Sequence, residues 1–191
     1  MKKIAFCSLF LLNTFIVVAQ HNGLGIRIGE PMAITFKRYL PSNRALEFMI
    51  GTAPNVFAST YYEKQFNRLY DDLEYKDHET RSVFYTAARY LFQFQVPTEG
   101  IEGKLDWYVG FGGVIKTARV EYFYRDFDIN GRDIFSTKKR DFDVGPEAIG
   151  GLEFTLQNIP LVVFGEMSFF FEVSNRASMR VFPGIGARYS F

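Results

Sequence analysis

The chain has 191 residues, 18% of them aromatic, and a formal net charge of +1. This length predicts one domain, and the balanced charge leaves no basic excess for nucleic acid binding. No segment beyond residue 19 approaches the roughly 18 consecutive apolar residues that a membrane helix requires. Composition therefore excludes a nucleic-acid-binding protein and a helical membrane protein, whereas many aromatic residues in a moderately polar chain are typical of a membrane β-barrel.

The N-terminus has the features of a secretory signal peptide. Two lysines precede an apolar run from Ile4 to Val18, and Val17-Val18-Ala19 supplies a small-residue cleavage site. We therefore assign 1–19 to a cleaved signal peptide and 20–191 to the mature barrel domain. An N-terminal membrane helix is the alternative, for which the apolar run is short. The only cysteine lies in this leader, so the mature protein is expected to have no disulfide or thiol chemistry.

Past the leader, apolar and polar residues alternate in eight segments, which is the period of a β-strand with one apolar face. Glu30-Pro31 separates the first two segments, and Pro41-Ser42-Asn43 forms a tight turn after the second. The third is bent at Ala53-Pro54, and a charged loop from Asn67 to Thr80 follows it. No α-helix is predicted in the mature chain. The expected strands are 23–29, 32–40, 45–66, 81–95, 105–129, 132–156, 161–173 and 179–191.

The fifth and sixth strands are predicted to form a long hairpin with Asn130-Gly131 at its tip, because both residues tolerate the positive φ of a type I′ turn. With this turn Ile129 faces Arg132 and, near the base, Trp107 faces Phe154. Both strands then place bulky apolar residues on one face and small or charged residues on the other. A soluble sandwich has the opposite arrangement, so the pattern predicts lipid outside the barrel. A soluble, lipocalin-like barrel is the alternative.

Short strand motifs recur along the mature chain, and the last strand ends on an aromatic residue. The motifs are Gly25–Gly29, Ile34–Leu40, Ala45–Glu47, Leu105–Gly110, Gly150–Phe154, Asn158–Leu161 and Gly186–Phe191. In order and spacing they resemble the small eight-stranded outer-membrane barrels of Gram-negative bacteria, in the OmpX/OmpA-like class. The resemblance, with the even strand count, implies an all-β, eight-stranded antiparallel up-and-down transmembrane β-barrel. We expect a monomer in outer-membrane lipid with both termini periplasmic.

The inner face that follows from the alternation is charged, and the two signs nearly cancel. An eight-stranded barrel is only wide enough for side chains to fill it, and unpaired buried charges are costly. We therefore predict a lumen closed by ion pairs and no pore. The expected members of this charge network are Arg27, Lys37, Arg89, Lys116 and Arg188, with Glu47, Asp106, Asp143, Glu147, Glu153 and Glu166.

The same inner-face acids admit a second hypothesis, a catalytic or proton-relay cluster. Its members would be Glu147, Glu153 and Glu166 with Arg89 or Arg188. A lipid-modifying site of His78 with Asp77 and Ser82 is a third hypothesis. Nucleophilic catalysis needs rigid surroundings that a charged loop tip lacks, and ion-pair networks explain the acids. We therefore predict no enzyme activity, no catalytic residue, no cofactor and no metal site.

Strands three to six exceed the about 9–11 residues that cross a membrane, so we predict that they protrude as an extracellular sheet. Its open edges invite strand addition by an extracellular protein partner; the alternative is that edge charges only maintain solubility. The candidate interaction residues at the tip are Tyr122, Tyr124, Asn130, Gly131, Lys138, Lys139 and Arg140. Asp126–Gly131 also matches the first half of a calcium loop, but Thr137 occupies the position that needs a glutamate.

The sequence thus predicts a non-enzymatic outer-membrane barrel with a structural role or a role in surface interaction through the protruding sheet. A lipid-modifying outer-membrane enzyme and a barrel subunit of an envelope or secretion assembly are the alternatives. The strand motifs indicate fold and location rather than activity, because most barrels of this class have no assigned ligand.

Overall fold

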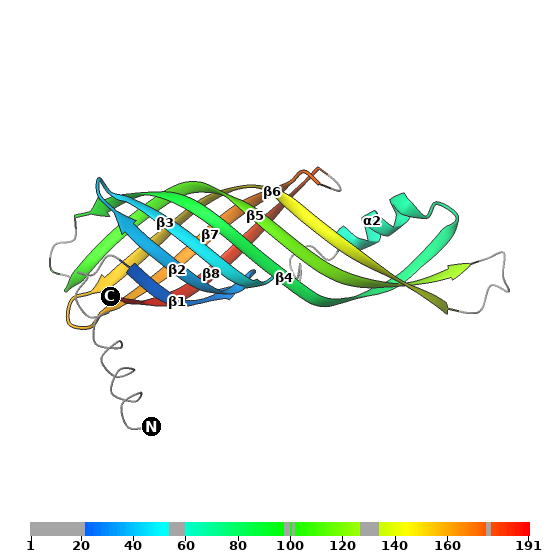
Figure 1. The fold of residues 1–191 in the computed structure, drawn as a ribbon, viewed down its shortest axis with the longest axis horizontal. Coiled ribbons are helices and arrows are strands. Elements are labelled where there is room, and N and C mark those ends of the chain that lie inside the picture. The colour runs from blue at the N-terminus through cyan, green and yellow to red at the C-terminus, as the bar shows by residue number, and fades with distance from the viewer. Residues whose placement is uncertain (1–21, 54–59, 98–99, 101, 127–133, 175–176) are drawn as a thin grey trace, which may run out of the picture.

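The computed structural model describes residues 22–53, 60–97, 100, 102–126, 134–174 and 177–191. Eight strands, each antiparallel to the next, form one sheet, and β1 pairs with β8 to close it (Figure 1). This closure confirms the predicted all-β, eight-stranded barrel. The predicted signal peptide and the Asn130-Gly131 tip lie outside the described residues. The strands are β1 (Asn22–Gly29), β2 (Met32–Leu40), β3 (Arg44–Thr52), β4 (Leu73–Val96), β5 (Gly103–Asp126), β6 (Ile134–Leu156), β7 (Leu161–Glu172) and β8 (Ser178–Ser190).

The alternation along each strand separates an apolar outer wall from a charged interior. In β1, Ile26 and Ile28 are 58% and 57% exposed, whereas Arg27 between them is fully buried. Water-soluble proteins bury large apolar residues, so this wall, which we call the apolar belt, is the inverse of a soluble surface. Its members on other strands include Phe92, Trp107, Phe111, Leu152, Met167 and Phe169.

Three strands continue beyond the barrel as a protruding sheet (Figure 1). β4, β5 and β6 have 24, 24 and 23 residues, and β5 pairs with β6 as far as Arg125 opposite Ile134. β3 ends at Thr52, and its pairing with β4 stops at Gly51 opposite Tyr85. The prediction that the third strand also protrudes was therefore wrong, because the chain after β3 forms a helix instead of a continued strand.

That helix, α2 (Tyr61–Leu69), packs against the protruding sheet, and Figure 1 shows it beside the extended strands. Tyr61, Tyr62, Gln65 and Phe66 are its buried residues, and their spacing is that of one face of a helix. The prediction of no helix was wrong, because adjacent tyrosines also favour strands. No helix in the described part of the chain is long and apolar enough to cross a membrane.

The outer half of β4 also differs from the prediction, since the strand begins at Leu73 within the expected charged loop. Its pairing with β5 shifts register twice, once between Tyr75 and Asp77 and once between Arg81 and Phe84. Each shift changes which β4 residues share a face with their β5 neighbours. The second shift places Arg81 opposite Arg119 of β5.

The hairpin of β5 and β6 has a register two residues away from the predicted one. Trp107 lies opposite Leu152 rather than Phe154, and Tyr108 lies opposite Gly151. A Cβ atom on Gly151 would lie 2.6 Å from the Tyr108 ring. The absence of a side chain at Gly151 therefore leaves room for this ring. Because the shift is an even number of residues, the inward and outward faces remain as predicted.

Candidate functional site

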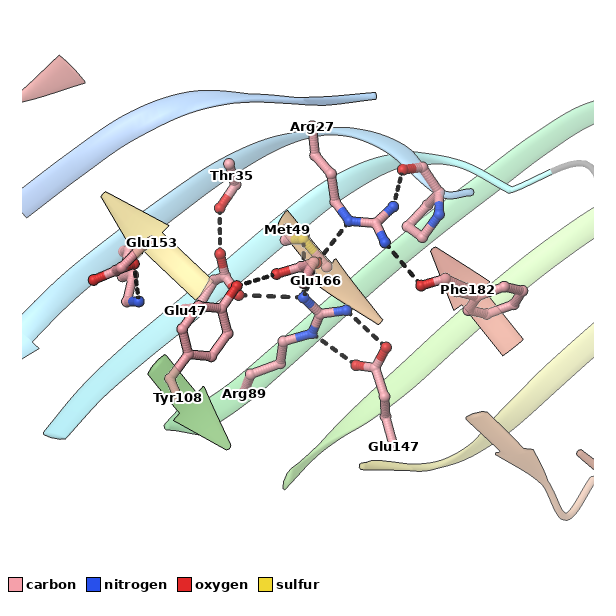
Figure 2. Close-up of polar contacts among 12 residues, drawn as sticks. Arg27, Thr35, Glu47, Met49, Arg89, Tyr108, Glu147, Glu153, Glu166 and Phe182 are labelled. Atoms are coloured by element: carbon pink, nitrogen blue, oxygen red, sulfur yellow. Dashed lines mark hydrogen bonds and ion pairs between the residues drawn. The ribbon is translucent and has the colours of Figure 1, made fainter. Parts of the chain in front are cut away.

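All eight strands contribute charged side chains to the barrel interior, and every predicted inner-face charge is buried. Most of these side chains join in one continuous set of hydrogen bonds and ion pairs, which we call the charge network (Figure 2). The alternation along each strand directs them inward, and the closed sheet brings them together from opposite walls. The members of the network are Arg27, Lys37, Glu47, Arg89, Glu147, Glu153, Glu166 and Arg188.

Arg89 lies at the centre of the charge network and contacts three carboxylates. Its Nε and Nη2 each donate to Glu147 at 2.7 Å, a bidentate pair. Its Nη1 lies 2.9 Å from Glu166 and 3.2 Å from Glu47. Arg27 donates to the same Glu166 at 2.7 Å. A side chain of β4 therefore connects acids from β3, β6 and β7, as Figure 2 shows.

The other end of the charge network is organised by Lys37 and Arg188. Lys37 lies 2.6 Å from Glu153 and its ammonium group sits 4.4 Å from the centre of the Tyr108 ring. Arg188 pairs with Glu47, and its guanidinium lies over a neighbouring aromatic ring at 3.6 Å. Cations here are thus held both by carboxylates and by ring faces.

A second group of charges, the mouth cluster, lies where β7 and β8 end on the side of the protruding sheet. Arg180 lies 2.8 Å from Asp143 and 3.0 Å from Glu172, and Lys116 lies 3.6 Å from Asp143. The Tyr61 hydroxyl of α2 donates to Glu172 at 2.8 Å, which ties the helix to the barrel. Sequence reasoning missed Glu172 and Arg180, although continuing the alternation along β7 and β8 places both on the inner face.

Asp106 lies apart from the charge network, at the opposite end of the barrel. Its partner is Lys104, at 2.8 Å, whose side chain is half exposed. A pocket of about 250 Å³ opens here, with Tyr39, Gln93 and Glu153 also in its wall. The structure thus divides the predicted lumen charges among the central network, the mouth cluster and this rim.

The face of the protruding sheet beneath α2 is aromatic. The Phe66 ring centroid lies 4.9–5.7 Å from those of Tyr70, Tyr75, Tyr122 and Tyr124, a set that we call the aromatic cluster. Tyr122 is 1% exposed and donates to Gln65 at 3.0 Å, and burial raises the pKa of its hydroxyl. Tyr122, a predicted interaction residue, is therefore buried beneath the helix, and Tyr124, predicted with it, is half buried in the same cluster.

His78 belongs to β4 rather than to a loop, and its ring is half buried. Its Nδ1 lies 2.5 Å from the Tyr75 hydroxyl, and its ring centroid lies 4.9 Å from that of Tyr62. Burial lowers the pKa of the imidazole, and nearby Asp77 opposes that shift. These contacts place His78 in the packing of α2. Within the described ranges, no group of three or more His, Cys, Asp or Glu side chains is positioned to hold a metal ion.

The opposite face of the protruding sheet is exposed and basic. Lys138 and Arg140 point outward on this face, whereas Lys139 lies opposite Val120 on the α2 side and is half buried. Lys138 lies 3.7 Å from Glu121 on β5. In the described part of the chain, residues 134–141 of β6 have no strand beyond them, because the pairing with β7 begins at Glu147. Asn130 and Gly131 lie outside the described residues, as does most of the calcium-loop motif.

Comparisons with known proteins concern the fold alone. No protein-family model and no curated protein matches the chain. The N-terminal β-barrel domain of OprF from Pseudomonas aeruginosa is 10% identical, with a TM-score of 0.45 and coverage of 89% of this chain and 94% of that one. Ail, the attachment invasion locus protein of Yersinia pestis, is 9% identical, with a TM-score of 0.45 and coverage of 89% and 93%.

A second structure of Ail, in complex with the heparin analogue sucrose octasulfate, is 8% identical, with a TM-score of 0.33 and coverage of 89% and 94%.

Proposed function

We propose that this protein is a non-enzymatic, monomeric outer-membrane β-barrel with a closed lumen, and that its protruding sheet acts in surface interaction. The observation that carries the proposal is the inversion of the barrel, with the apolar belt outside and ion pairs inside. Large apolar side chains around a closed sheet are stable in hydrocarbon and not in water. Residues 1–19 would direct export as a signal peptide, and 20–191 would insert with both termini in the periplasm.

The charge network supports a lumen without a pore. Side chains of an eight-stranded barrel already fill its interior, and Arg89 of β4 connects to β3, β6 and β7 through Glu47, Glu147 and Glu166. Separating one partner from a buried pair costs about 3–5 kcal/mol. Opening a water path through the centre would require several such separations.

The same geometry argues against a proton relay. Glu147 accepts two parallel hydrogen bonds from one guanidinium, and Glu166 accepts from Arg27, Arg89 and Tyr108. These acids are buried and act as fixed acceptors, so they have no route to a substrate. The contacts of His78 with two tyrosines similarly serve to pack α2.

The edge of β6 supports a role in surface interaction. Backbone groups along residues 134–141 face away from β5 without a strand beside them in the described chain. Such an edge can accept a strand from an extracellular protein, and the lysines at 138 and 139 discourage pairing with a second copy. The protruding sheet is rigid enough to present this edge, because α2 and the aromatic cluster pack against one face of the sheet.

Placement in lipid can be tested with Trp107, the only tryptophan of the chain, which lies in the apolar belt. Refolding the mature protein into liposomes whose acyl chains carry bromine should quench its fluorescence strongly. A Trp107→Phe/Phe123→Trp variant moves the reporter to the protruding sheet and should be quenched little. Equal quenching at the two positions would count against the proposed placement.

The interaction role can be tested by crosslinking on intact cells. The full-length protein is compared with a variant whose 121–140 tip is shortened, after checking by migration in unheated gels that both barrels fold. Partners crosslinked only to the full-length protein would support the protruding sheet as the working part. An identical set of crosslinked proteins for both would assign the interaction elsewhere.

A further inference from the structure

Three arginines lie side by side across the outer face of the protruding sheet. Arg81 of β4 is opposite Arg119 of β5, and Arg119 is in turn opposite Arg140 of β6. Adjacent strands lie about 4.8 Å apart, so this arginine row holds three like charges at close range. Like charges directly opposite each other destabilise a sheet. The arrangement therefore favours the presence of an anion.

The row depends on an irregularity in β4. Phe84 lies opposite Thr117, whereas Arg81 lies opposite Arg119, so β4 has one more residue in this interval than β5. The extra residue reverses the alternation of β4 and brings Arg81 onto the face shared with Arg119. Bulges of this kind redirect side chains at functional places in sheets.

Neighbouring acids offset the charge at only one end of the row. Arg81 lies 2.6 Å from Glu79, but both side chains are more than half exposed, and an exposed pair of this kind is weak. Glu121 also interacts with Arg81 electrostatically, and it pairs with Lys138 at 3.7 Å. Across the described ranges, no acidic side chain forms an ion pair with Arg119 or Arg140.

The row lines a half-open depression in the outer face of the sheet. The pocket has a volume of about 370 Å³, within the range of small-ligand sites, and its wall also includes Val120, Glu121, Lys138 and Lys139. Cations thus outnumber the single acid in the lining. The planar fork of a guanidinium matches two phosphate oxygens, which gives arginine an advantage over lysine at such sites.

The pocket also borders the apolar belt. Phe84 and Phe142, 45% and 48% exposed, form the last outward row of the belt on β4 and β6. Arg119 lies two residues beyond Thr117 of that row, about 7 Å along the strand. If the belt spans the hydrocarbon, as the proposed function states, the arginine row lies at the height of the lipid head groups. Glu79 and Glu121 bound it on the side of the tip.

We propose that the arginine row is a binding site for the phosphate groups of anionic lipids in the surrounding leaflet. Arg119 and Arg140 donate to the phosphate oxygens, and Arg81 exchanges its exposed partner Glu79 for the same anion. This inference rests on the proposed membrane placement. It adds a ligand class and a contact surface on the outer face of the protruding sheet, next to the β6 edge.

The test uses the mature protein folded in zwitterionic detergent. Calorimetric titration compares micelles that contain phosphatidic acid, micelles that contain diacylglycerol with the same chains, and soluble inorganic pyrophosphate. We expect phosphatidic acid to bind at least about tenfold more tightly than pyrophosphate, since the acyl chains pack on the belt beside Phe84 and Phe142, and diacylglycerol to bind negligibly. Pyrophosphate binding as tight as that of the lipid would overturn the assignment to a lipid head group.

Variants separate a built site from general charge attraction. Arg119→Ala/Arg140→Ala should weaken phosphatidic acid binding by about tenfold or more, and Arg119→Lys/Arg140→Lys should also weaken it although it keeps the charge. The matched control Arg44→Ala/Lys64→Ala removes two exposed cations elsewhere and should bind like the wild type. Unchanged binding by the first variant, or equal losses in the first variant and the control, would overturn the site.

The two proposals fail in different ways. Quenching of Trp107 by brominated lipid reports on membrane placement and does not depend on the arginine row. Strong quenching with unchanged phosphatidic acid binding in Arg119→Ala/Arg140→Ala would reject the site and leave the barrel proposal intact.

Discussion

The barrel interior and the outer face of the protruding sheet both concentrate charge, but they hold it in opposite ways. Inside, Arg89 is buried and contacts acids from three other strands. Outside, Arg119 is exposed and has an arginine on each side. A buried charge must be paired to be tolerated, whereas an exposed one can remain available to a ligand. The interior charges therefore stabilise the fold, whereas the arginine row is suited to binding.

The largest expected effect comes from removing the central interior cation. Arg89→Met leaves Glu147 without its bidentate partner and reduces the compensation of Glu47 and Glu166. We expect the free energy of unfolding to fall by about 3–5 kcal/mol, measured by urea unfolding in micelles with Trp107 fluorescence. Lys64→Met on the exposed face of α2 is the control and should change it by about 0.5 kcal/mol or less. A loss below about 1 kcal/mol for Arg89→Met would mean that the charge network contributes little.

The next effect concerns the protruding sheet alone. Phe66→Ala removes the central ring of the aromatic cluster and should reduce the local stability of α2 by about 3 kcal/mol. Hydrogen exchange of residues 61–69 should accelerate while amides of β1 and β8 remain protected. Equal acceleration in the barrel would show that the two regions unfold together and are not separable.

A smaller effect of opposite sign is expected at the arginine row. Without lipid, Arg119→Thr removes a like charge that faces Arg81 and Arg140. We expect the outer parts of β4 to β6 to gain about 0.2–1 kcal/mol, measured by hydrogen exchange in zwitterionic detergent. High salt should abolish the gain by screening. A loss of local stability in Arg119→Thr would mean that the row has internal compensation.

The smallest effect is the pH dependence of helix docking. Burial lowers the folded-state pKa of His78, so the unfolded state binds more protons below about pH 6.5. Docking stability that His78 contributes is present above that pH and is lost as the pH falls toward the folded pKa. The protection of α2 amides, relative to their intrinsic exchange rate at each pH, should therefore fall more from pH 7.5 to 5.5 in the wild type than in His78→Phe. Because Asp141 also lies beneath α2, only the difference between the two proteins reports on His78.

The set of inward-facing residues could be predicted from the sequence because strand alternation has a fixed period of two. Arg27 between two exposed isoleucines shows how this period assigns a face without a known register. The pairing register of β5 with β6 was harder to predict. The Asn130-Gly131 turn signal predicted one register. The structure has a register two residues away, in which the Tyr108 ring lies over Gly151.

The protruding sheet was harder to predict because its features depend on contacts between distant segments. The tyrosines at 61 and 62 fit a strand as well as a helix, and only their packing on Tyr122 and its neighbours distinguishes the two. The arginine row needs both the register of β5 with β6 and the irregularity between Arg81 and Phe84. No local pattern in the sequence contains that information.

We propose that paired charges close this barrel and that its outer wall faces lipid. Single-channel recording in planar bilayers tests it most directly, using mature protein whose folding is verified by its migration in unheated gels. We predict that the wild-type protein inserts without producing conductance steps, because the charge network fills the lumen. Reproducible open channels from the folded wild-type protein would contradict the account.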